Sequence, residues 1–460
     1  MRIITDNGAD SGLIKKYNVA APRYTSYPTV PYWTDSPTAE QWKLEVKKAF
    51  DKTNSTEGIS IYMHLPFCQS LCTYCGCTTR ITVNHKVEQP YLEAVLKEWK
   101  MYRGILGGKP RIKELHLGGG TPTFFSPENL ARLLKGILED VEICPNPEFS
   151  FEAHPNNTTY EHLKVLYELG FTRLSLGIQD LDPVVQEIIN RIQPVENVER
   201  VTREARELGY KSINYDLIYG LPLQKKSSVI HTTETVVRLK PDRIALYSYA
   251  HVPWIKPGQR KFTEADLPAD EEKRELYETA RNILEEAGYV EIGMDHFALK
   301  TDSLYKAMQT KTLHRNFMGY TSSHTTFCLG LGVSAISDTW TAFAQNIKTV
   351  EEYYEALNKG ELPIFRGHLL SKEDVILRQH ILNIMCKFET SWADSKDQIP
   401  AVYDAVNSLK ELEMDGLITR MPFGLKVTEE GRKFIRNICM AFDARLMRHT
   451  PEKQIFSKVI

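Results

Sequence analysis

The chain has 460 residues, of which 42% are hydrophobic and 25% charged, and its formal net charge is −2. This length predicts one large catalytic domain with smaller additions, built with the composition of an ordinary globular protein. A net charge so close to zero gives no general attraction for nucleic acid or for an anionic membrane. The N-terminus has no apolar stretch like a signal peptide, and no apolar run is long enough for a membrane span, so we expect a cytoplasmic protein.

Residues 1–50 are predicted to form an N-terminal arm and a lead-in helix, followed by a catalytic domain at 51–360. Between about 58 and 250, short β-rich runs alternate with amphipathic helical stretches. The predicted strands are 58–67, 112–120, 148–155, 171–179, 210–222 and 241–250. Such alternation predicts a parallel α/β sheet. Polar or cysteine-rich segments follow every strand, which favours a barrel, where site residues converge from all strands, over a doubly wound sheet.

The last hundred residues, 361–460, are predicted to form a mainly α-helical C-terminal domain. Two helical stretches are followed by a segment like a two-stranded wing, with its turn at Pro422–Gly424, and then by another helix. Winged-helix modules often bind DNA, but the helices here carry no dense Lys/Arg face. We therefore expect a lid that packs on the main domain, with a nucleic-acid reader as the alternative.

Four of the eight cysteines lie in one short stretch, HLPFCQSLCTYCGC, which runs from His64 to Cys77. Zinc ribbons and fingers use two pairs of ligands a dozen or more residues apart, and no second pair follows here at such a spacing. Three thiolates spaced C-x3-C-x2-C, at Cys68, Cys72 and Cys75, suit three corners of a [4Fe–4S] cubane. Cys77 lies too close to Cys75 to reach the fourth corner easily, so we expect a free thiol that lines the site. The remaining cysteines are predicted to be buried apolar residues: Cys144, Cys328, Cys386 and Cys439.

The spacing of the three cysteines, with Tyr74 before the third, resembles the signature of the radical S-adenosylmethionine enzymes. That resemblance implies a cluster whose open iron chelates S-adenosylmethionine and whose electron cleaves it to a 5′-deoxyadenosyl radical. The glycine run Gly118–Gly120 with Thr121 follows the second predicted strand, where backbone N–H groups can approach a charged ligand. Glu152 ends the third strand, where a carboxylate can bind ribose hydroxyls; its simpler interpretation is a buried ion pair.

Further motifs resemble one family within that superfamily, the oxygen-independent coproporphyrinogen III oxidases. They are PRYTSYPT, the CxC ending of the cysteine loop, LHLGGGTPT, RLSLGIQD, INYDLIYGLP, GMDHFA, LHRNFMGY, GVSAIS and IRNIC. They occur in the family's order and extend over nearly the whole chain. The resemblance implies an incomplete barrel of six β/α units, a partial (β/α)6 TIM-like fold, open at the side to admit a tetrapyrrole.

The resemblance also implies a set of binding residues. Three cysteines would ligate the cluster: Cys68, Cys72 and Cys75. The S-adenosylmethionine on the cluster would contact Tyr62, Gly119, Glu152 and Ile336. A second S-adenosylmethionine would contact Tyr74, Gly120, Thr121, Gln179, Arg191, Asp216 and Ala250. The chain departs from the family at Met318, where an amide side chain can stand.

The reaction implied is oxidative decarboxylation of two propionates of coproporphyrinogen III to vinyls, which gives protoporphyrinogen IX in anaerobic haem biosynthesis. The substrate carries four carboxylates, so cationic and hydrogen-bonding groups are needed around it. Arg23 and Tyr24 in the N-terminal arm are candidates, although the arm can equally be a strap across the barrel. The electron donor and the final acceptor are not identified, and the family suggests a monomer.

Three other interpretations stay open at this point. The first is a haem chaperone that keeps the radical fold without turning over coproporphyrinogen. The second is a radical S-adenosylmethionine enzyme that acts on another tetrapyrrole. The third is a zinc-bound regulator with a winged-helix DNA reader.

Overall fold

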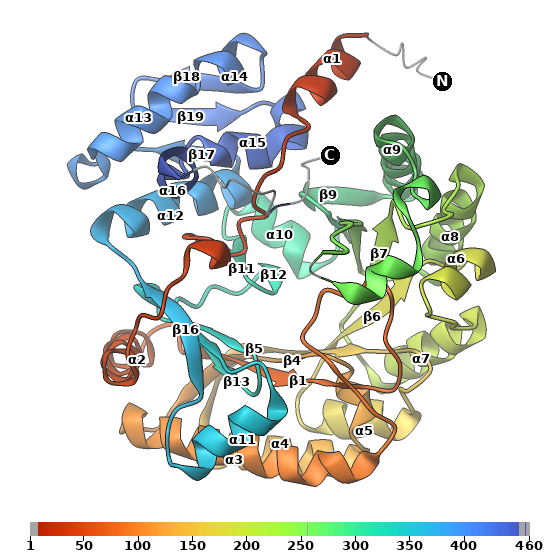
Figure 1. Cartoon of the computed structure of the whole chain (residues 1–460), viewed down its shortest axis with the longest axis vertical. Helices are drawn as coiled ribbons and strands as arrows, with labels where there is room; N and C mark the ends of the chain where they lie inside the picture. The colour runs from red at the N-terminus through yellow and green to blue at the C-terminus, as the bar shows by residue number, and fades with distance from the viewer. Residues whose placement is uncertain (1–7, 255, 450–455, 457–460) are drawn as a thin grey trace.

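A single large sheet organises most of the molecule. The computed structural model describes residues 8–254, 256–449 and 456. Within them the largest sheet has 12 strands in the order β16-β15-β14-β13-β1-β4-β5-β6-β7-β8-β10-β9 (Figure 1). Six successive strands form its parallel core: β1 (Ile59–Leu65), β4 (Arg111–Gly119), β5 (Glu142–Ala153), β6 (Arg173–Gln179), β7 (Ser212–Tyr219) and β8 (Arg243–Ser248).

These six strands confirm the predicted α/β core. Each pairs in parallel with the next one along the chain. The connecting helices are α3 (Glu88–Leu106), α4 (Pro127–Leu138), α5 (Tyr160–Glu168), α6 (Pro183–Ile188), α7 (Val195–Leu208) and α8 (Lys226–Leu239). In the described part of the chain the outermost strands, β16 and β9, do not pair with each other. The β/α units therefore form an open, incomplete barrel.

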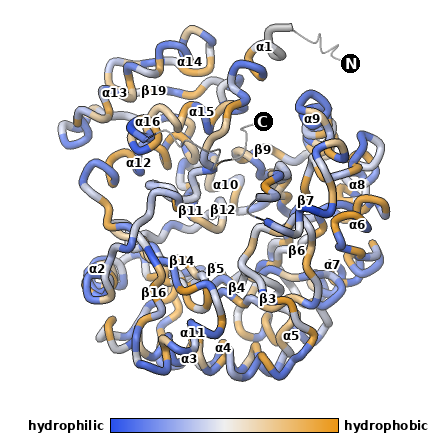
Figure 2. Tube along the Cα trace, in the orientation of Figure 1, coloured by the Kyte–Doolittle hydropathy of each residue, from blue (hydrophilic) through white to orange (hydrophobic). Residues whose placement is uncertain are grey.

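The outer helices follow from their apolar periodicity. In α4, Leu130, Leu133, Leu134 and Ile137 are all fully buried, at the i, i+3, i+4, i+7 spacing of one helix face. Ser126 caps this helix by accepting from the backbone N–H of Asn129. Figure 2 shows hydrophobic and hydrophilic residues alternating along the helices that surround the sheet. Their apolar faces pack on the outer side of the sheet in one large hydrophobic core.

Both edges of the parallel core are extended. β13 (Cys328–Leu331) pairs in parallel with β1, and β14 (Ile336–Asp338), β15 (Ala342–Asn346) and β16 (Ile364–Leu369) continue that edge antiparallel. At the other edge, β10 (His296–Leu299) pairs antiparallel with β8, followed by β9 (Tyr289–Gly293). Helices α9 (Asp270–Glu286), α10 (Ser303–Gln309) and α11 (Val350–Asn358) lie in these extensions. β16 falls inside the segment 361–460, so the first strand of that segment belongs to the main sheet.

The remaining elements form a second unit around the C-terminal residues. It contains α12 (Lys372–Lys387), α13 (Pro400–Ser408), α14 (Lys410–Met414), α15 (Ile435–Met440), α16 (Ala444–Arg448) and a small sheet of β17 (Glu389–Ser391), β18 (Ile418–Met421) and β19 (Gly424–Val427). The predicted wing is confirmed: β18 and β19 form an antiparallel hairpin. A second hydrophobic core joins this unit to Tyr17, Tyr24 and Tyr27 of the N-terminal arm.

Short elements complete the chain. The arm carries α1 (Gly8–Tyr17), which Figure 1 shows beside the C-terminal elements, and the lead-in helix is α2 (Ala39–Thr53). β2 (Phe67–Cys68) pairs with β3 (Arg80–Ile81), and β11 (His314–Asn316) pairs with β12 (Gly319–Thr321). None of the helices in the described ranges is both long and apolar enough to cross a membrane.

Candidate active site

The inner faces of the parallel strands are polar and surround a cavity of about 830 Å³. Side chains alternate along a strand, so one set of residues faces the helices and the other faces the inside of the barrel. In β7, Ser212, Asn214 and Asp216 line the cavity, whereas Ile213 and Tyr215 are fully buried in the outer core. Polar side chains on the inner face can therefore bind a ligand without weakening the apolar packing outside.

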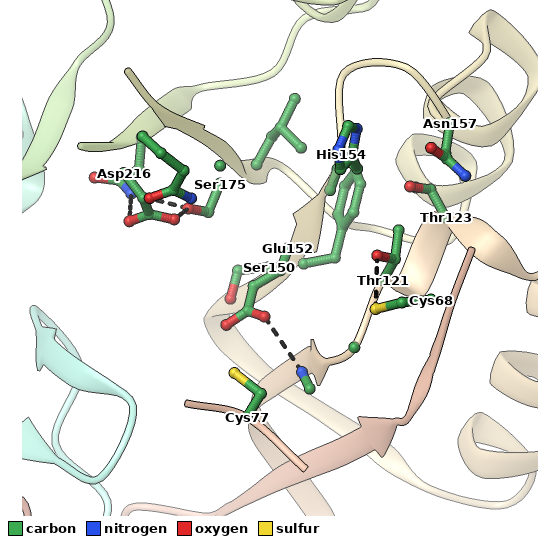
Figure 3. Close-up of a pocket in the computed structure, with 18 of the residues that line it drawn as sticks. Cys68, Cys77, Thr121, Thr123, Ser150, Glu152, His154, Asn157, Ser175 and Asp216 are labelled. Carbon is green, nitrogen blue, oxygen red and sulfur yellow. Dashed lines mark hydrogen bonds between the residues drawn. The ribbon is translucent and has the colours of Figure 1, made fainter. Parts of the chain in front are cut away.

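The cysteine loop lies across one end of this cavity. Cys68, Cys72, Cys75 and Cys77 all line it, and none of them is in a disulfide. The Sγ atom of Cys68 lies 3.3 Å from the hydroxyl of Thr121 (Figure 3). The backbone N–H of Cys75 donates to the carbonyl of Cys72 at 3.1 Å, which closes a tight turn between two of the thiols. The loop thus turns its thiols toward the same space as the strand ends.

The three predicted ligands suit a cluster. Cys68, Cys72 and Cys75 are each partly exposed to the cavity. Among the described residues, no three His, Cys, Asp or Glu side chains converge on a position for a single metal ion. A cubane has no need of such convergence, because each thiolate binds a different iron. The guanidinium of Arg191, 3.6 Å from the Sγ of Cys72, places a positive charge beside the thiolates.

The free-thiol prediction for Cys77 stays a prediction, but its surroundings are defined. Cys77 is exposed and lines the cavity, and Figure 3 shows it near Glu152. A hydrogen bond with Cys77 is the main cause that lowers the pKa of Cys75. Cys77 therefore contacts one of the expected cluster ligands.

Glu152 is held at the end of β5 by two neighbours from β4. Its carboxylate accepts the backbone N–H of Gly119 at 3.2 Å and lies 3.6 Å from Nε2 of His116. Burial raises the pKa of Glu152, but hydrogen bonds with His116 and Gly119 outweigh it and bring the pKa below its ordinary value. Gly119 has φ +111°, and a Cβ there would meet the ring of His64 at 2.7 Å. Only glycine fits this close approach.

Asp216 is the second carboxylate of the cavity, and its environment differs. It accepts from the hydroxyl of Ser175 at 2.8 Å and from the amide of Asn214 at 2.9 Å (Figure 3). Burial is the main cause that raises the pKa of Asp216 to about 6. Neither of its hydrogen-bond partners is a cation, and these bonds, with the charge of Arg191, only partly offset the loss of water.

Gln179 and Arg191 lie between the cysteine loop and Asp216. Gln179 ends β6 with φ +66°, a left-handed backbone conformation that is uncommon for a residue with a side chain. Arg191 donates to the carbonyl of Gly177 at 2.5 Å as well as to Cys72. Arg191 thereby connects the end of β6 to the cysteine loop. Both side chains line the cavity, as do Tyr74, Gly120 and Thr121.

Three of the predicted S-adenosylmethionine contacts do not line the cavity. Tyr62, Ala250 and Ile336 do not line the cavity, although Tyr62 is near it: its ring stacks on His116, with centroids 5.9 Å apart. Met318, where the chain departs from the family, lines the cavity.

The structure places Arg23 and Tyr24 away from the cavity. Arg23 pairs with Asp295 in a second, smaller pocket, and its guanidinium lies 5.7 Å from the ring centre of Tyr247. Tyr247 lines the main cavity, so Arg23 is one side chain removed from it. Tyr24 is 3% exposed and donates to Asp443 of the C-terminal unit. These contacts are those of a strap between the barrel and the C-terminal unit.

Sequence reasoning missed three polar residues that organise the two carboxylates: His116, Ser175 and Asn214. Each lies on a predicted strand, two positions away from a residue that was singled out or that faces the cavity. Strict alternation along those strands would have placed them on the inner face.

Comparison with known proteins identifies the fold and the loop. The family model of the radical S-adenosylmethionine superfamily matches residues 62–236. The coproporphyrinogen III oxidase of Escherichia coli, solved and described as a radical S-adenosylmethionine enzyme, superposes with a TM-score of 0.87 at 35% identity. That match covers 95% of this chain and 99% of the other.

Relatives of known name match over the same length. The oxygen-independent coproporphyrinogen III oxidase of Helicobacter pylori (strain J99) is 39% identical, over 94% of this chain and 95% of its own. The enzyme of that name from Escherichia coli K12 is 38% identical, over 98% of both chains.

The fold and the cysteine loop thus define a radical S-adenosylmethionine enzyme, which uses a [4Fe–4S] cluster and S-adenosylmethionine. The chain belongs to the family of the oxygen-independent coproporphyrinogen III oxidases. The zinc-bound regulator is thereby set aside.

Proposed function

We propose that this chain converts coproporphyrinogen III to protoporphyrinogen IX by oxidative decarboxylation of two propionates to vinyls, in anaerobic haem biosynthesis. The observation that carries the proposal is the near-complete match to coproporphyrinogen III oxidases, which includes the N-terminal arm and the C-terminal unit as well as the barrel. A haem chaperone and an enzyme for another tetrapyrrole are the alternatives that the experiment below separates.

The bound cofactors supply a 5′-deoxyadenosyl radical that can take a hydrogen atom from a propionate side chain. The chain's own residues bind and orient the reacting groups. Cys68, Cys72 and Cys75 would hold the cluster, with Arg191 offsetting negative charge beside them. Glu152, kept ionised by His116, would bind the ribose of S-adenosylmethionine next to the backbone of Gly119. Tyr62 and Ile336 are proposed as further contacts of the same molecule.

A second S-adenosylmethionine is part of the proposal. Its proposed contacts are Tyr74, Gly120, Thr121, Gln179, Arg191, Asp216 and Ala250. All of these except Ala250 line one cavity, which supports their grouping. Asp216 would face a cationic ligand, whose positive charge would bring the pKa of this buried carboxyl back down.

Arg23 and Tyr24 are proposed as substrate contacts only if the arm rearranges. For Arg23 to bind a propionate, its ion pair with Asp295 would have to open. Tyr24 would have to leave Asp443. The strap role that these contacts describe requires neither change.

Several wider features are proposed with the function. The chain would act as a monomer in the cytoplasm, where reducing conditions keep the cluster thiols free. Its three parts would be an arm at 1–50, the catalytic domain at 51–360 and the C-terminal domain at 361–460, with no nucleic acid or membrane as a partner.

The experiment that tests the function is anaerobic turnover. Protein reconstituted with iron and sulfide is incubated with coproporphyrinogen III, S-adenosylmethionine and dithionite, and the iron content is measured on the same sample. We expect protoporphyrinogen IX together with 5′-deoxyadenosine and methionine. Absence of vinyl product from a sample with a full cluster, with haem bound one to one instead, would assign the chain to the chaperones.

A further inference from the structure

Two cations lie beside one exposed aromatic ring outside the cavity, and the charge of a third acts on one of them. Lys348 follows β15, and Phe365 and Arg366 lie on β16. The Nζ of Lys348 lies 5.3 Å from the ring centre of Phe365, and the guanidinium carbon of Arg366 lies 5.7 Å from it. Lys256, from the segment after β8, lies close enough for its charge to act on Lys348. We call these four residues the cationic patch.

The charges of the patch have no carboxylate partner in the described part of the chain. Arg366 donates to the side-chain carbonyl of Gln345 at 2.9 Å, which is neutral. Partial burial, followed by the positive charges of Arg366 and Lys256, lowers the pKa of Lys348. Lys359, in contrast, is paired with Glu355 at 2.8 Å. The patch is therefore a local excess of positive charge on a chain whose net charge is −2.

The patch adjoins the cysteine loop from the solvent side. Lys256 Nζ donates to the carbonyl of Gly76 at 2.8 Å, and Gly76 lies between Cys75 and Cys77. Arg80, three residues past Cys77, pairs with Glu351 at 3.0 Å, and Glu351 lies three residues after Lys348. None of the four patch residues lines the main cavity. The patch is thus a surface close to the cluster ligands but outside the space that holds the substrate.

A protein partner suits this surface better than the substrate does. Phe365 is 52% exposed, and an exposed aromatic beside an arginine is typical of the centre of a protein–protein contact. Unpaired cations at the rim of such a contact steer an acidic partner into place and accelerate association. The substrate's propionates, in contrast, must enter the cavity to meet the reacting groups.

We propose that the cationic patch is the docking surface for an acidic protein that carries single electrons at low potential. The proposal rests on the proposed function, in which the cysteine loop holds the cluster. In the step that the contact serves, the carrier's flavin or iron–sulfur centre is oxidised by one electron and the [4Fe–4S] cluster is reduced by one. One such electron is consumed for each S-adenosylmethionine that is cleaved.

The test measures reduction of the cluster itself. Reconstituted holoenzyme is mixed anaerobically with a reduced acidic ferredoxin, and formation of the reduced cluster is followed by rapid-mixing absorbance and electron paramagnetic resonance. The variant is Lys348→Glu with Arg366→Glu; the matched control, Lys135→Glu with Lys410→Glu, makes the same change of net charge on exposed helix positions. Lys256 is left unchanged because it contacts the cysteine loop.

We expect the patch variant to be reduced by the ferredoxin at least about tenfold more slowly at low salt, and the control within about twofold of wild type. The wild-type rate should fall as salt is added, and the variant's rate should change little. The single variant Lys348→Glu, at an exposed position, should lie between the two and guards against a folding defect. Dithionite, which needs no docking, should reduce all forms alike.

Two results would overturn the proposal. One is equal reduction of the patch variant and wild type by ferredoxin, including the case in which ferredoxin reduces neither. The other is unchanged reduction together with a raised KM for coproporphyrinogen III in the dithionite assay, which would assign the patch to the substrate. Failure of the wild type to form vinyl product with dithionite would instead count against the proposed function.

Discussion

Two carboxylates in one cavity, Glu152 and Asp216, have pKa values shifted in opposite directions. Both are removed from water, which by itself favours the protonated form. Glu152 has His116 and a backbone N–H as partners, so its charge is compensated. Asp216 has only neutral partners, so its pKa is raised to about 6. A buried anion without a compensating charge costs folding free energy, and such a cost is often retained where a ligand supplies the missing charge.

Replacement of Asp216 tests this cost. The carboxyl has a folded pKa above its unfolded value, so the stability it contributes is present at low pH and is lost as the pH rises through about 6. Asn at this position does not titrate. The free energy of unfolding of Asp216→Asn and of wild type is measured with urea on the cofactor-free proteins. We expect the variant's value minus the wild-type value to rise by about 2 to 3 kcal/mol from low to mildly alkaline pH. A difference that does not change with pH would show that Asp216 is not strained by burial.

Substitutions of the four loop cysteines should have different effects on the cluster, because three of them are expected to be ligands and one is not. Cys68→Ala, Cys72→Ala and Cys75→Ala should each abolish the cluster and all turnover, because a cubane with two protein ligands is not retained. Cys77→Ser should keep about four irons per chain, since Cys77 is expected to be no ligand. Iron and sulfide analysis after anaerobic reconstitution makes the comparison. Substantial iron loss in Cys77→Ser would contradict the three-ligand assignment.

At the scale of elements, one buried side chain connects its own helix to three other parts of the fold. Glu98, on α3, accepts from the backbone N–H of Gly332 after β13, from the amide of Asn346 on β15, and from the hydroxyl of Tyr353 on α11. Burial raises the pKa of Glu98 to about 7. The turn after β13 lies beside the cysteine loop's strand, since Gly332 approaches the backbone of His64. Glu98 thus fixes the extended edge of the sheet against the outer helices.

Removal of this side chain should be costly. Glu98→Ala leaves three buried donors without an acceptor, so we expect a loss of about 3 to 5 kcal/mol in the free energy of unfolding, measured with urea. Glu93→Ala serves as the control, because Glu93 is exposed on the same helix and should cost less than about 1 kcal/mol. Similar losses for the two variants would show that the network does not hold the edge.

At the scale of the whole molecule, the two ends of the chain form one unit. Arg436 of α15 donates to the carbonyls of Ala21 and Pro22 in the arm. Asn437 donates to the carbonyl of Tyr17, and Tyr24 donates to Asp443. The arm therefore completes the C-terminal core and lies between it and the barrel (Figure 1). Much of this contact is apolar burial of aromatic rings, which is non-directional and strong.

Tyr24 distinguishes a strap from a substrate contact. Tyr24→Ala should lower the free energy of unfolding by about 3 to 5 kcal/mol, as other deletions of buried aromatic rings do. Tyr24→Phe keeps the ring and loses the hydrogen bond to Asp443, for an expected cost of about 1 kcal/mol. If the arm is only a strap, Tyr24→Phe should leave the KM for coproporphyrinogen III unchanged. A severalfold rise in that KM, with stability preserved, would restore the hydroxyl of Tyr24 as a substrate contact.

Local patterns predicted a large part of the fold. All six strands of the parallel core, the helices between them and the hairpin at 418–427 follow from alternation, helical periodicity and turn residues within short windows. The extensions of the sheet were not predicted: no strands were predicted where β9, β10 and β13–β15 lie, and β16 lies in the segment that was predicted to be mainly α-helical. These strands are short and are stabilised by pairing with neighbouring strands of the sheet. Such pairing partners cannot be recognised from a short stretch of sequence.

The cysteine spacing, the strand-end glycines and the order of the motifs were determined by the sequence alone, because each depends on residues near one another along the chain. Only the tertiary structure decided which side chains share a space. It brought Asp216, Gln179 and Arg191 to the cysteine loop, packed Tyr24 in the C-terminal core, and placed Lys348 and Arg366 beside the ring of Phe365. The physical reason is that charge compensation and burial act through space, between residues far apart in the chain.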